Sequence, residues 1–383
     1  MFLWGKSHII SLKTKTLKKH TLLSLPMDVH EKVDLVKQVG EEILTEEELV
    51  TLFETKDRPI AYDGFEPSGQ LHIAQGILRA INVNKMISAN VHFKMWVADW
   101  FGWMNNKMGG DLDKIRTVGE YQIETWKACG MSTDKVEFLW SKDSMADDEY
   151  WKKVVQIARH NTVTRIVRCS QIMGRSEKDQ LSAAQIFYPC MQCADIFHLE
   201  ADITQLGMDQ RKVNVLAREV GPKLGWWKPI VVNHHMLMGL SAPPSDVSDP
   251  VERALAMKMS KSRPETAIFM TDSTEEVTSK INKAYCPEGQ VNENPLLEYW
   301  RYILFEKYPS LTIERPEKFG GSLEFHNYPS LEDAFSKKDI HPLDLKKATI
   351  HYVDELLDPV RKHFSSGKPQ QLLEEVQSFS VTR

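Results

Sequence analysis

The strongest constraint on the fold is an alternation of candidate strands and helices between residues 57 and 233. Short runs of β-forming residues recur along this stretch, separated by longer stretches with apolar residues at helical spacing. The candidate strands are Pro59–Asp63, Val91–Ala98, Val136–Trp140, Asp202–Leu206 and Pro229–Asn233. The candidate helices are Gln70–Ser88, Leu112–Cys129, Asp148–Cys169, Pro189–Leu199 and Asp209–Val220. This order predicts a parallel, doubly wound α/β sheet, which binds ligands at the carboxyl ends of its strands.

The rest of the chain divides around this alternation. Residues 28–56 are rich in Glu and Lys, with apolar positions at helical spacing, and predict an N-terminal helical segment. Adjacent prolines at 243 and 244 mark a loop after the last strand. From about Thr271 the pattern is helical. We therefore expect an α/β domain over 57–247, a linker over 248–270 and a smaller all-helical domain over 271–383.

Composition narrows the class of protein. The 383 residues carry a formal net charge of −5, so the chain lacks the basic surface that non-specific nucleic-acid binding needs. Five scattered cysteines are typical of a reducing compartment, and no apolar run is long enough for a membrane span. Residues 1–27 hold five lysines and no acid, which predicts a disordered basic tail. An organelle-targeting signal is the alternative, although such signals are usually rich in arginine, which this tail lacks.

A glycine-bearing turn, Gly64–Gly69, connects the first candidate strand to the next candidate helix. Backbone N–H groups and the dipole at a helix N-terminus favour a bound phosphate, and Gly64 allows the backbone to approach it closely. His72 and Gln75 are three residues apart, so we expect both to donate hydrogen bonds from one face of the first helical turn. The alternative is an ordinary helix cap with a surface histidine.

A second candidate phosphate-binding segment follows the last candidate strand. This is Lys258–Ser262, with the sequence K-M-S-K-S, called the KMSKS segment below. The ammonium groups of Lys258 and Lys261 and the hydroxyls of Ser260 and Ser262 suit a pyrophosphate leaving group, whose negative charge grows in the transition state. For this segment alone, a basic linker is an equal alternative.

Together, and in this order, the two motifs resemble the signature pair of class I aminoacyl-tRNA synthetases. The resemblance implies a Rossmann-like catalytic domain that binds ATP, with His72 and Gln75 near the phosphates and the KMSKS lysines beside them. The KMSKS segment matches the family pattern in full. The first motif departs from the pattern H-I-G-H, because Ala74 and Gln75 replace the glycine and the second histidine. Gln75 keeps a hydrogen-bond donor but cannot become a cation.

A polar stripe marks the candidate helix that starts near Pro189, which we expect in its first turn. Tyr188, Gln192 and Asp195 stand at i, i+4 and i+7, on one helical face among apolar neighbours, so they need partners. The alternative is a core helix whose polar residues satisfy one another. The pattern Y-P-x-x-Q-x-x-D resembles the amino-acid-binding helix of tyrosyl-tRNA synthetases of the archaeal and eukaryotic cytosolic type.

This resemblance extends over nearly the whole chain and implies roles for the pocket residues. Asp195 accepts the proton of the substrate phenol, and Tyr62 on the first strand makes the second phenol contact. Tyr188, Gln192 and Gln210 hold the amino-acid backbone. A pocket built to pair with a phenol rejects phenylalanine, because the buried carboxylate would then stay unpaired.

The turn Gly207–Lys212 resembles the family's G-x-D-Q turn. The resemblance implies that Asp209 binds the ATP ribose, and Asn214, one turn further on, is a candidate for the lining. Cys190 and Cys193 form a C-x-x-C pair, but no second pair completes a metal site. We therefore favour buried packing over a zinc or redox site and expect no protein-bound metal.

Two segments of the C-terminal region resemble the anticodon-binding parts of archaeal tyrosyl-tRNA synthetases. They are Arg315–Gly321 and His341–Lys346. The resemblance implies that Phe319 stacks on the first anticodon base and that Asp344 pairs with its edge. A turn phenylalanine and a helix-capping aspartate are the alternative.

The sequence as a whole is interpreted as a tyrosine–tRNA ligase that activates L-tyrosine with ATP and Mg²⁺ and transfers it to tRNA(Tyr). No tightly bound cofactor is expected. The resemblance implies a cytoplasmic homodimer that pairs through residues 112–169 and the start of the Pro189 helix. A tryptophanyl-tRNA synthetase is one alternative, against which Tyr62 and Asp195 argue. A catalytically silent, RNA-binding paralogue is another, supported only by Gln75.

Overall fold

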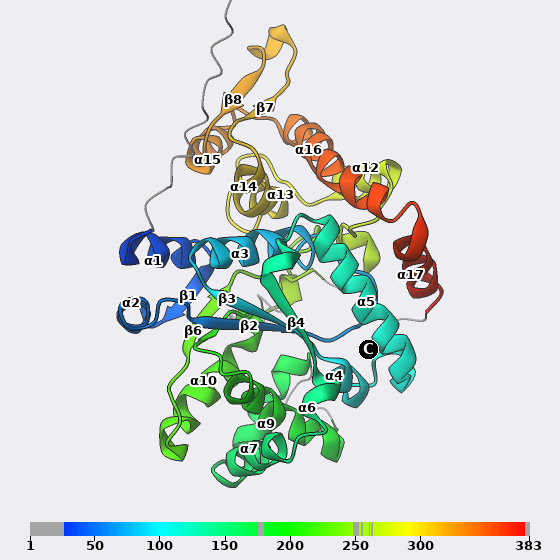
Figure 1. Ribbon diagram of the computed structural model, residues 1–383. Coiled ribbons are helices and arrows are strands. Elements are labelled where there is room, and N and C mark those ends of the chain that lie inside the picture. The colour runs from blue at the N-terminus through cyan, green and yellow to red at the C-terminus, as the bar shows by residue number, and fades with distance from the viewer. Residues whose placement is uncertain are drawn as a thin grey trace, which may run out of the picture.

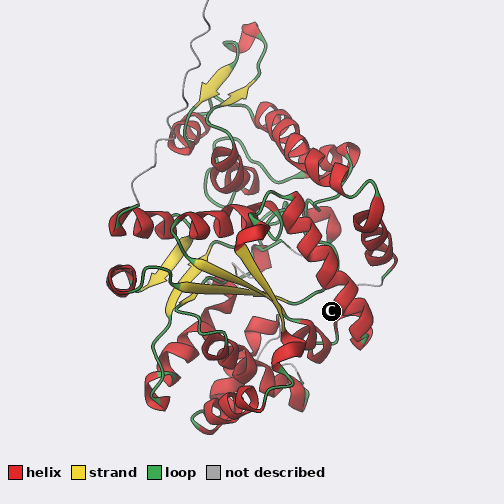
Figure 2. Ribbon diagram, in the orientation of Figure 1, coloured by secondary structure: helices red, strands yellow, loops and turns green. Residues whose placement is uncertain are grey.

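The computed structural model describes residues 27–174, 180–247, 253, 256–259, 261 and 263–379. The predicted basic tail, apart from Met27, and the two serines Ser260 and Ser262 lie outside the described residues. A central sheet lies between two layers of helices, and a further, mainly helical region lies beyond one of these layers (Figures 1 and 2). No helix among the described residues is long and apolar enough to cross a membrane.

The sheet has six strands in the order β1-β6-β5-β2-β3-β4. The strands are β1 (Gly40–Leu44), β2 (Ile60–Phe65), β3 (His92–Val97), β4 (Val136–Trp140), β5 (Ile203–Thr204) and β6 (Ile230–His234). Strands β2 to β6 are parallel where they pair, and β1 runs antiparallel to β6. All five predicted strands are present, which confirms the predicted α/β class.

The order of the strands locates the place for a ligand. From β2 the chain adds β3 and β4 on one side, then returns to add β5 and β6 on the other side. The strand order therefore reverses between β2 and β5. In doubly wound sheets, a crevice opens outside the carboxyl ends of the strands at such a reversal.

The N-terminal segment departs from the prediction. Residues 28–56 were expected to be helical throughout, but β1 lies between helices α1 (Val29–Lys37) and α2 (Glu46–Thr55). Ile43 pairs with Val232, so this stretch completes the edge of the sheet beside β6. Pairing with a distant strand outweighs the helical spacing of a short Glu-rich stretch, because tertiary contacts override local propensity.

Helices cover both faces of the sheet. They are α3 (Ile77–Ser88), α4 (Asp99–Met104), α5 (Leu112–Ala128), α6 (Ser141–Ser144), α7 (Asp148–Arg159), α8 (Val163–Arg168), α9 (Ala183–His198) and α10 (Arg211–Val220). Side chains alternate along the strands: Ala61 and Phe93 belong to one core cluster, and Tyr62 and Trp96 belong to the other. The first cluster includes residues of α1, α3 and α5, and the second includes residues of α7, α9 and α10. This period-2 alternation is the pattern of a sheet buried on both faces.

Helix α9 begins earlier than predicted. Its N-cap is Ser182, which forms a capping box with Gln185, so Pro189 lies inside the helix and not in its first turn. The capping signal lies seven residues before the proline. An early proline was therefore the wrong marker for the start of this helix. The predicted helix over 148–169 is also divided, into α7 and α8, with Thr162 as the second N-cap.

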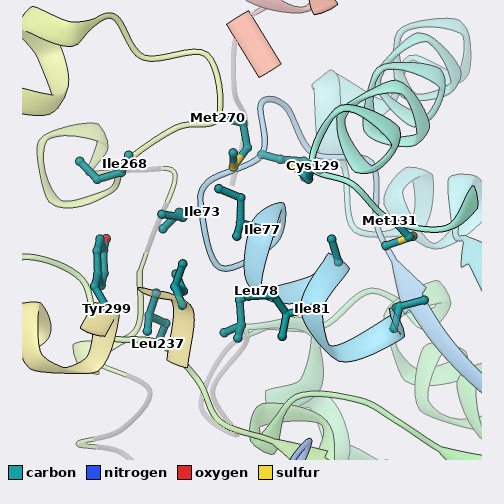
Figure 3. Close-up of a cluster of buried hydrophobic side chains, with 14 of the residues drawn as sticks. Ile73, Ile77, Leu78, Ile81, Cys129, Met131, Leu237, Ile268, Met270 and Tyr299 are labelled. Carbon is teal, nitrogen blue, oxygen red and sulfur yellow. The ribbon is translucent and has the colours of Figure 1, made fainter. Parts of the chain in front are cut away.

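The segment before α3 also differs from the prediction. Helix α3 starts at Ile77, so His72 and Gln75 lie in a turn ahead of it and not in its first turn. His72 pairs with Phe269 in an antiparallel bridge, and the Ile73 N–H donates to the Ile268 carbonyl at 2.8 Å. Figure 3 shows Ile73 and Ile77 close to Ile268 and Met270. Pairing with the chain that follows the KMSKS segment thus replaces the expected helical turn.

The C-terminal region is mainly helical, as predicted. Its helices are α12 (Thr274–Lys283), α13 (Pro295–Tyr299), α14 (Phe305–Lys307), α15 (Tyr328–Ser336), α16 (Pro342–His363) and α17 (Gly367–Ser378), with a π-helical turn at Trp300–Leu304. A short ladder of β7 (Leu311–Ile313) and β8 (Leu323–Phe325), absent from the prediction, joins them. Helix α17 packs beside α5 of the α/β domain (Figure 1). The core on this side continues from the sheet into the C-terminal helices.

Candidate active site

A cavity of about 250 Å³ opens where the strand order reverses. Its walls come from the carboxyl ends of β2, β3 and β6, from α9, and from the turn before α3. The lining includes most of the residues singled out from the sequence: Tyr62, Gly64, His72, Gln75, Tyr188, Gln192, Asp195, Asp209, Gln210 and Lys258. Segments nearly 200 residues apart therefore meet at one site.

One end of the cavity holds a buried carboxylate and a buried phenol. Asp195 on α9 is 1% exposed, and its Oδ1 accepts a hydrogen bond of 2.9 Å from the Tyr150 hydroxyl. Burial raises the pKa of Asp195 well above its usual range, while the Tyr150 hydroxyl acts in the opposite direction. Tyr62 on β2 is equally buried, and its hydroxyl has no hydrogen-bond partner among the described residues. This end can pair with one further polar group.

Polar side chains of α9 and of the G-x-D-Q turn line the adjoining wall. Gln192 Nε2 donates to Gln210 Oε1 at 3.0 Å, and the Tyr188 hydroxyl donates to Glu66 Oε1 at 2.6 Å. Burial, and then the nearby Glu66 carboxylate, raises the pKa of Tyr188 well above its usual range, so its hydroxyl stays protonated. Glu66 adds a carboxylate to this wall, which suits a cationic group such as an ammonium.

His72 lies on the opposite wall and is 7% exposed. Burial, and then Lys261 and Lys258, lowers its pKa well below the usual range, so the imidazole is neutral near pH 7. Its Nδ1 and the Gln75 side-chain oxygen have no hydrogen-bond partner among the described residues. Gly64 belongs to β2 and not to the predicted turn, because the strand extends to Phe65.

Of the two lysines of the KMSKS segment, Lys258 lines the cavity and Lys261 does not. Lys258 Nζ lies 3.0 Å from Asp209 Oδ2, and Met238 pairs with Lys258 in an antiparallel bridge. Lys261 Nζ donates to Ser68 Oγ at 3.1 Å, and burial lowers its pKa to about 7. A nearby anion would restore full charge to this lysine, because an opposite charge favours the ionised form.

A buried ionic network, which the sequence did not reveal, supports the floor of the cavity. Arg79 Nη1 lies 2.6 Å from Asp63 Oδ2 and donates to Gln205 Oε1 at 3.1 Å, and Nη2 lies 2.8 Å from His234 Nε2. Burial raises the pKa of Asp63 to about 7, although Arg79 acts against this. Burial also lowers the pKa of His234 well below its usual range, so its neutral ring can accept from the guanidinium.

Some residues named from the sequence lie elsewhere. Asn214 does not line the cavity but donates to Asn233 Oδ1 at 2.8 Å in the core. Cys190 and Cys193 are buried in the second core cluster. Phe319, in a 3₁₀ turn of the C-terminal region, is 61% exposed, and Asp344 lies in the first turn of α16.

Sequence reasoning missed Tyr150, Glu66, Trp96 and Arg79. Glu66 and Trp96 stand within three residues of the carboxyl ends of predicted strands, which was a usable signal. Arg79 looked like one more charged residue on an amphipathic helix. Tyr150 is near the start of α7, 45 residues from Asp195, and no spacing rule links them.

Comparison with known proteins agrees with this geometry. Residues 54–358 match the model of the family of class I tRNA synthetases (W and Y). The chain is 51% identical over 360 residues to the cytoplasmic tyrosine–tRNA ligase 1 of Arabidopsis thaliana, covering 93% of this chain and 90% of that protein. A tyrosyl-tRNA synthetase from Pyrococcus horikoshii, solved with L-tyrosine, superposes with a TM-score of 0.86 at 37% identity, covering 92% of this chain and all of that one. A Leishmania major tyrosyl-tRNA synthetase, solved with tyrosinol, gives 0.84 at 45% identity, covering 92% of this chain and 61% of that one.

The fold and the cavity thus define a class I aminoacyl-tRNA synthetase, and the chain belongs to the family of tryptophan and tyrosine enzymes. Its relatives at 48–51% identity are tyrosine–tRNA ligases. The chain is accordingly a tyrosine–tRNA ligase, an enzyme that uses ATP as a substrate, and the interpretation of the sequence is confirmed. The tryptophan-specific and silent alternatives are set aside.

Proposed function

We propose that the cavity holds L-tyrosine with its phenol between Tyr62 and Asp195. The buried Asp195 carboxylate beside the unpartnered Tyr62 hydroxyl carries this proposal. A phenol that donates to Asp195 and accepts from Tyr62 would pair both groups, whereas phenylalanine would leave both unpaired. Tyr188, Gln192 and Gln210 then face the amino-acid backbone of the substrate.

ATP is proposed to lie over the turn before α3. His72, Gln75 and Gly64 line the cavity and are proposed to contact its phosphates, and Asp209, which also lines the cavity, is proposed to bind the ribose hydroxyls. Lys258 and Lys261, with Ser260 and Ser262 of the same segment, are proposed to hold the leaving pyrophosphate. Mg²⁺ would arrive with ATP, since this cation is usually bound by phosphates and water with only one or two carboxylates.

The proposed chemistry needs no protein nucleophile. The tyrosine carboxylate attacks the α-phosphorus of ATP, the bond to the β-phosphate oxygen breaks, and pyrophosphate leaves. Neutral His72 donates a hydrogen bond to the phosphates, and the two lysines offset the charge that grows on the leaving group. The terminal adenosine hydroxyl of tRNA(Tyr) then attacks the carbonyl carbon of the adenylate, and AMP leaves.

ATP–pyrophosphate exchange tests the tyrosine pocket. Wild-type protein should exchange with tyrosine but not with tryptophan or phenylalanine. Asp195→Ala should abolish exchange with tyrosine while ATP binding stays measurable. Asp272→Ala is the matched control, because Asp272 is also a buried carboxylate but pairs with Lys280 away from the cavity. Retained tyrosine exchange in Asp195→Ala would contradict the assignment.

A homodimer is proposed through α7, α8 and the start of α9. Val155, Val163 and Phe187 on these helices are 50%, 67% and 48% exposed, which is unusual for large apolar side chains. Helices α7 and α8 each pack against α9, and these exposed apolar side chains are proposed to contact a second copy of the chain. Sedimentation velocity should show a dimer, and Val163→Asp should shift it towards monomer.

The proposed partner of the protein is tRNA(Tyr), and its proposed compartment is the cytoplasm. Phe319 and Asp344 are proposed to contact the anticodon of tRNA(Tyr). The ring of Phe319 is 61% exposed, with Lys318 Nζ 4.8 Å from its centroid, and stacking on an unpaired base is the proposed contact. The cytoplasm is proposed as the compartment, in line with the cytoplasmic relative from Arabidopsis thaliana.

A further inference from the structure

Tyr150 contacts a residue of the tyrosine pocket from outside the cavity. Its side chain is fully buried on α7 and is not part of the cavity wall, yet its hydroxyl donates to Asp195 Oδ1 at 2.9 Å. The same hydroxyl lies 3.3 Å from the Met191 carbonyl, and its ring meets the edge of His198 at a centroid distance of 5.2 Å. These contacts hold the phenol of Tyr150 in one orientation.

The contact leaves Asp195 with one oxygen for the substrate. Because Tyr150 engages Oδ1, Oδ2 is the oxygen available to a phenol in the cavity. The ionised carboxylate accepts from both sides more strongly than the protonated form, which keeps fewer free lone pairs. Burial favours the protonated form of Asp195, and a hydrogen bond donated to the carboxylate favours the ionised form.

The other groups around Asp195 add no formal positive charge. Tyr62 faces it from β2, and Cys193 and Tyr188 lie near it on α9. The Trp96 indole N–H approaches from β3 and also lowers the pKa of Asp195, although it lies outside strict hydrogen-bond geometry. Tyr150 is thus the one donor in full hydrogen-bond geometry to this carboxylate among the described residues.

We propose that Tyr150 is a positioning residue for tyrosine selection, which orients Asp195 so that Oδ2 accepts the substrate phenol. The inference rests on the proposed tyrosine pocket. Tyr150 touches no substrate atom and acts through Asp195.

The test replaces only the hydroxyl. Tyr150→Phe should raise the KM for tyrosine about tenfold and lower the preference for tyrosine over phenylalanine, as expected for the loss of one hydrogen bond to a charged group. The KM for ATP should change less than about twofold. The pH at which tyrosine binding reaches half its maximum should move upward, because Asp195 loses a donor that favours its ionised form. Tyr299→Phe is the matched control, since its hydroxyl is likewise buried outside the cavity wall but, unlike that of Tyr150, has no hydrogen-bond partner among the described residues.

A double-mutant cycle with Asp195→Asn separates the possible failures. If Tyr150 acts through Asp195, the Tyr150→Phe change should have little further effect in the Asp195→Asn background. Equal increases in both KM values with an unmoved pH profile would overturn the inference, as would additive effects in the cycle. An Asp195→Asn protein that still selects tyrosine would overturn the pocket itself, and this inference with it.

Discussion

His235 lies between two carboxylates from distant parts of the chain. Its Nδ1 is 3.2 Å from Glu41 Oε2 on β1, and its Nε2 is 3.2 Å from Glu298 Oε2 on α13. The ring stacks on Tyr302 at a centroid distance of 4.3 Å. Glu298 also accepts from the backbone N–H of Met238 at 2.8 Å. The Nε2 contact is an ion pair outside strict hydrogen-bond geometry, and two carboxylates this close to the ring favour its charged form.

The contribution of His235 to the free energy of unfolding follows from its pKa. Burial alone would lower the pKa of His235, but Glu298 and Glu41 outweigh it and raise the pKa to about 9. A raised histidine pKa stabilises the fold fully below the unfolded value of 6.5, and the stabilisation is lost as pH rises through about 9. Linkage between these two values gives roughly 3 kcal/mol below pH 6.5, roughly 2 kcal/mol at about pH 7.5 and almost nothing above about pH 10.

His235→Gln tests this reasoning, because glutamine keeps a hydrogen-bonding side chain that cannot become charged. At about pH 7.5 the variant should unfold in urea with a free energy roughly 2 kcal/mol below that of the wild type. The control is His363→Gln, since His363 also contacts a carboxylate, Glu124 Oε2, at 2.7 Å, and joins α16 to α5. That pair is singly bridged and partly exposed, so its loss should cost less than about 1 kcal/mol.

Unfolding measured at several pH values distinguishes the loss of charge from a disturbance of packing. The deficit of His235→Gln should widen at pH 6 and close at about pH 10, where the wild-type ring is neutral as well. A deficit of the same size at pH 7.5 and pH 10 would show that glutamine disturbs packing on Tyr302 and that the charge contributes nothing.

Three further predictions concern other parts of the molecule. Arg79→Lys should lower the free energy of unfolding by about 3 kcal/mol in urea titrations, because one ammonium cannot replace the forked contacts of the buried guanidinium. Gly221→Ala should lower it by about 2 kcal/mol, since the new Cβ would meet the backbone oxygen of Trp227 at 2.4 Å. Phe319→Ala should raise the KM for tRNA about tenfold in aminoacylation assays and leave ATP–pyrophosphate exchange unchanged, as expected for one lost stacking contact.

Local patterns in the sequence were sufficient to find most of the fold and the site. Strands β2 to β6 were visible as short β-forming runs between turns, and Tyr188, Gln192 and Asp195 were grouped correctly because helical spacing alone puts them on one face. The wrong predictions share a cause. Each of these features depended on a contact or a cap that the dominant local pattern did not display: β1, the turn at His72 and the start of α9.

By itself the sequence determined the order of the elements, the class of the sheet and the residue types available for phosphate, ribose and phenol. These follow from local spacing, since neighbours along a helix or strand have fixed geometry. Only the tertiary structure decided that Tyr150 meets Asp195, that Arg79 bridges Asp63 and His234, and that His235 is charged between two glutamates. Such contacts join segments up to 257 residues apart along the chain, as His235 does between Glu41 and Glu298. Their strength depends on burial, which only the packed chain creates.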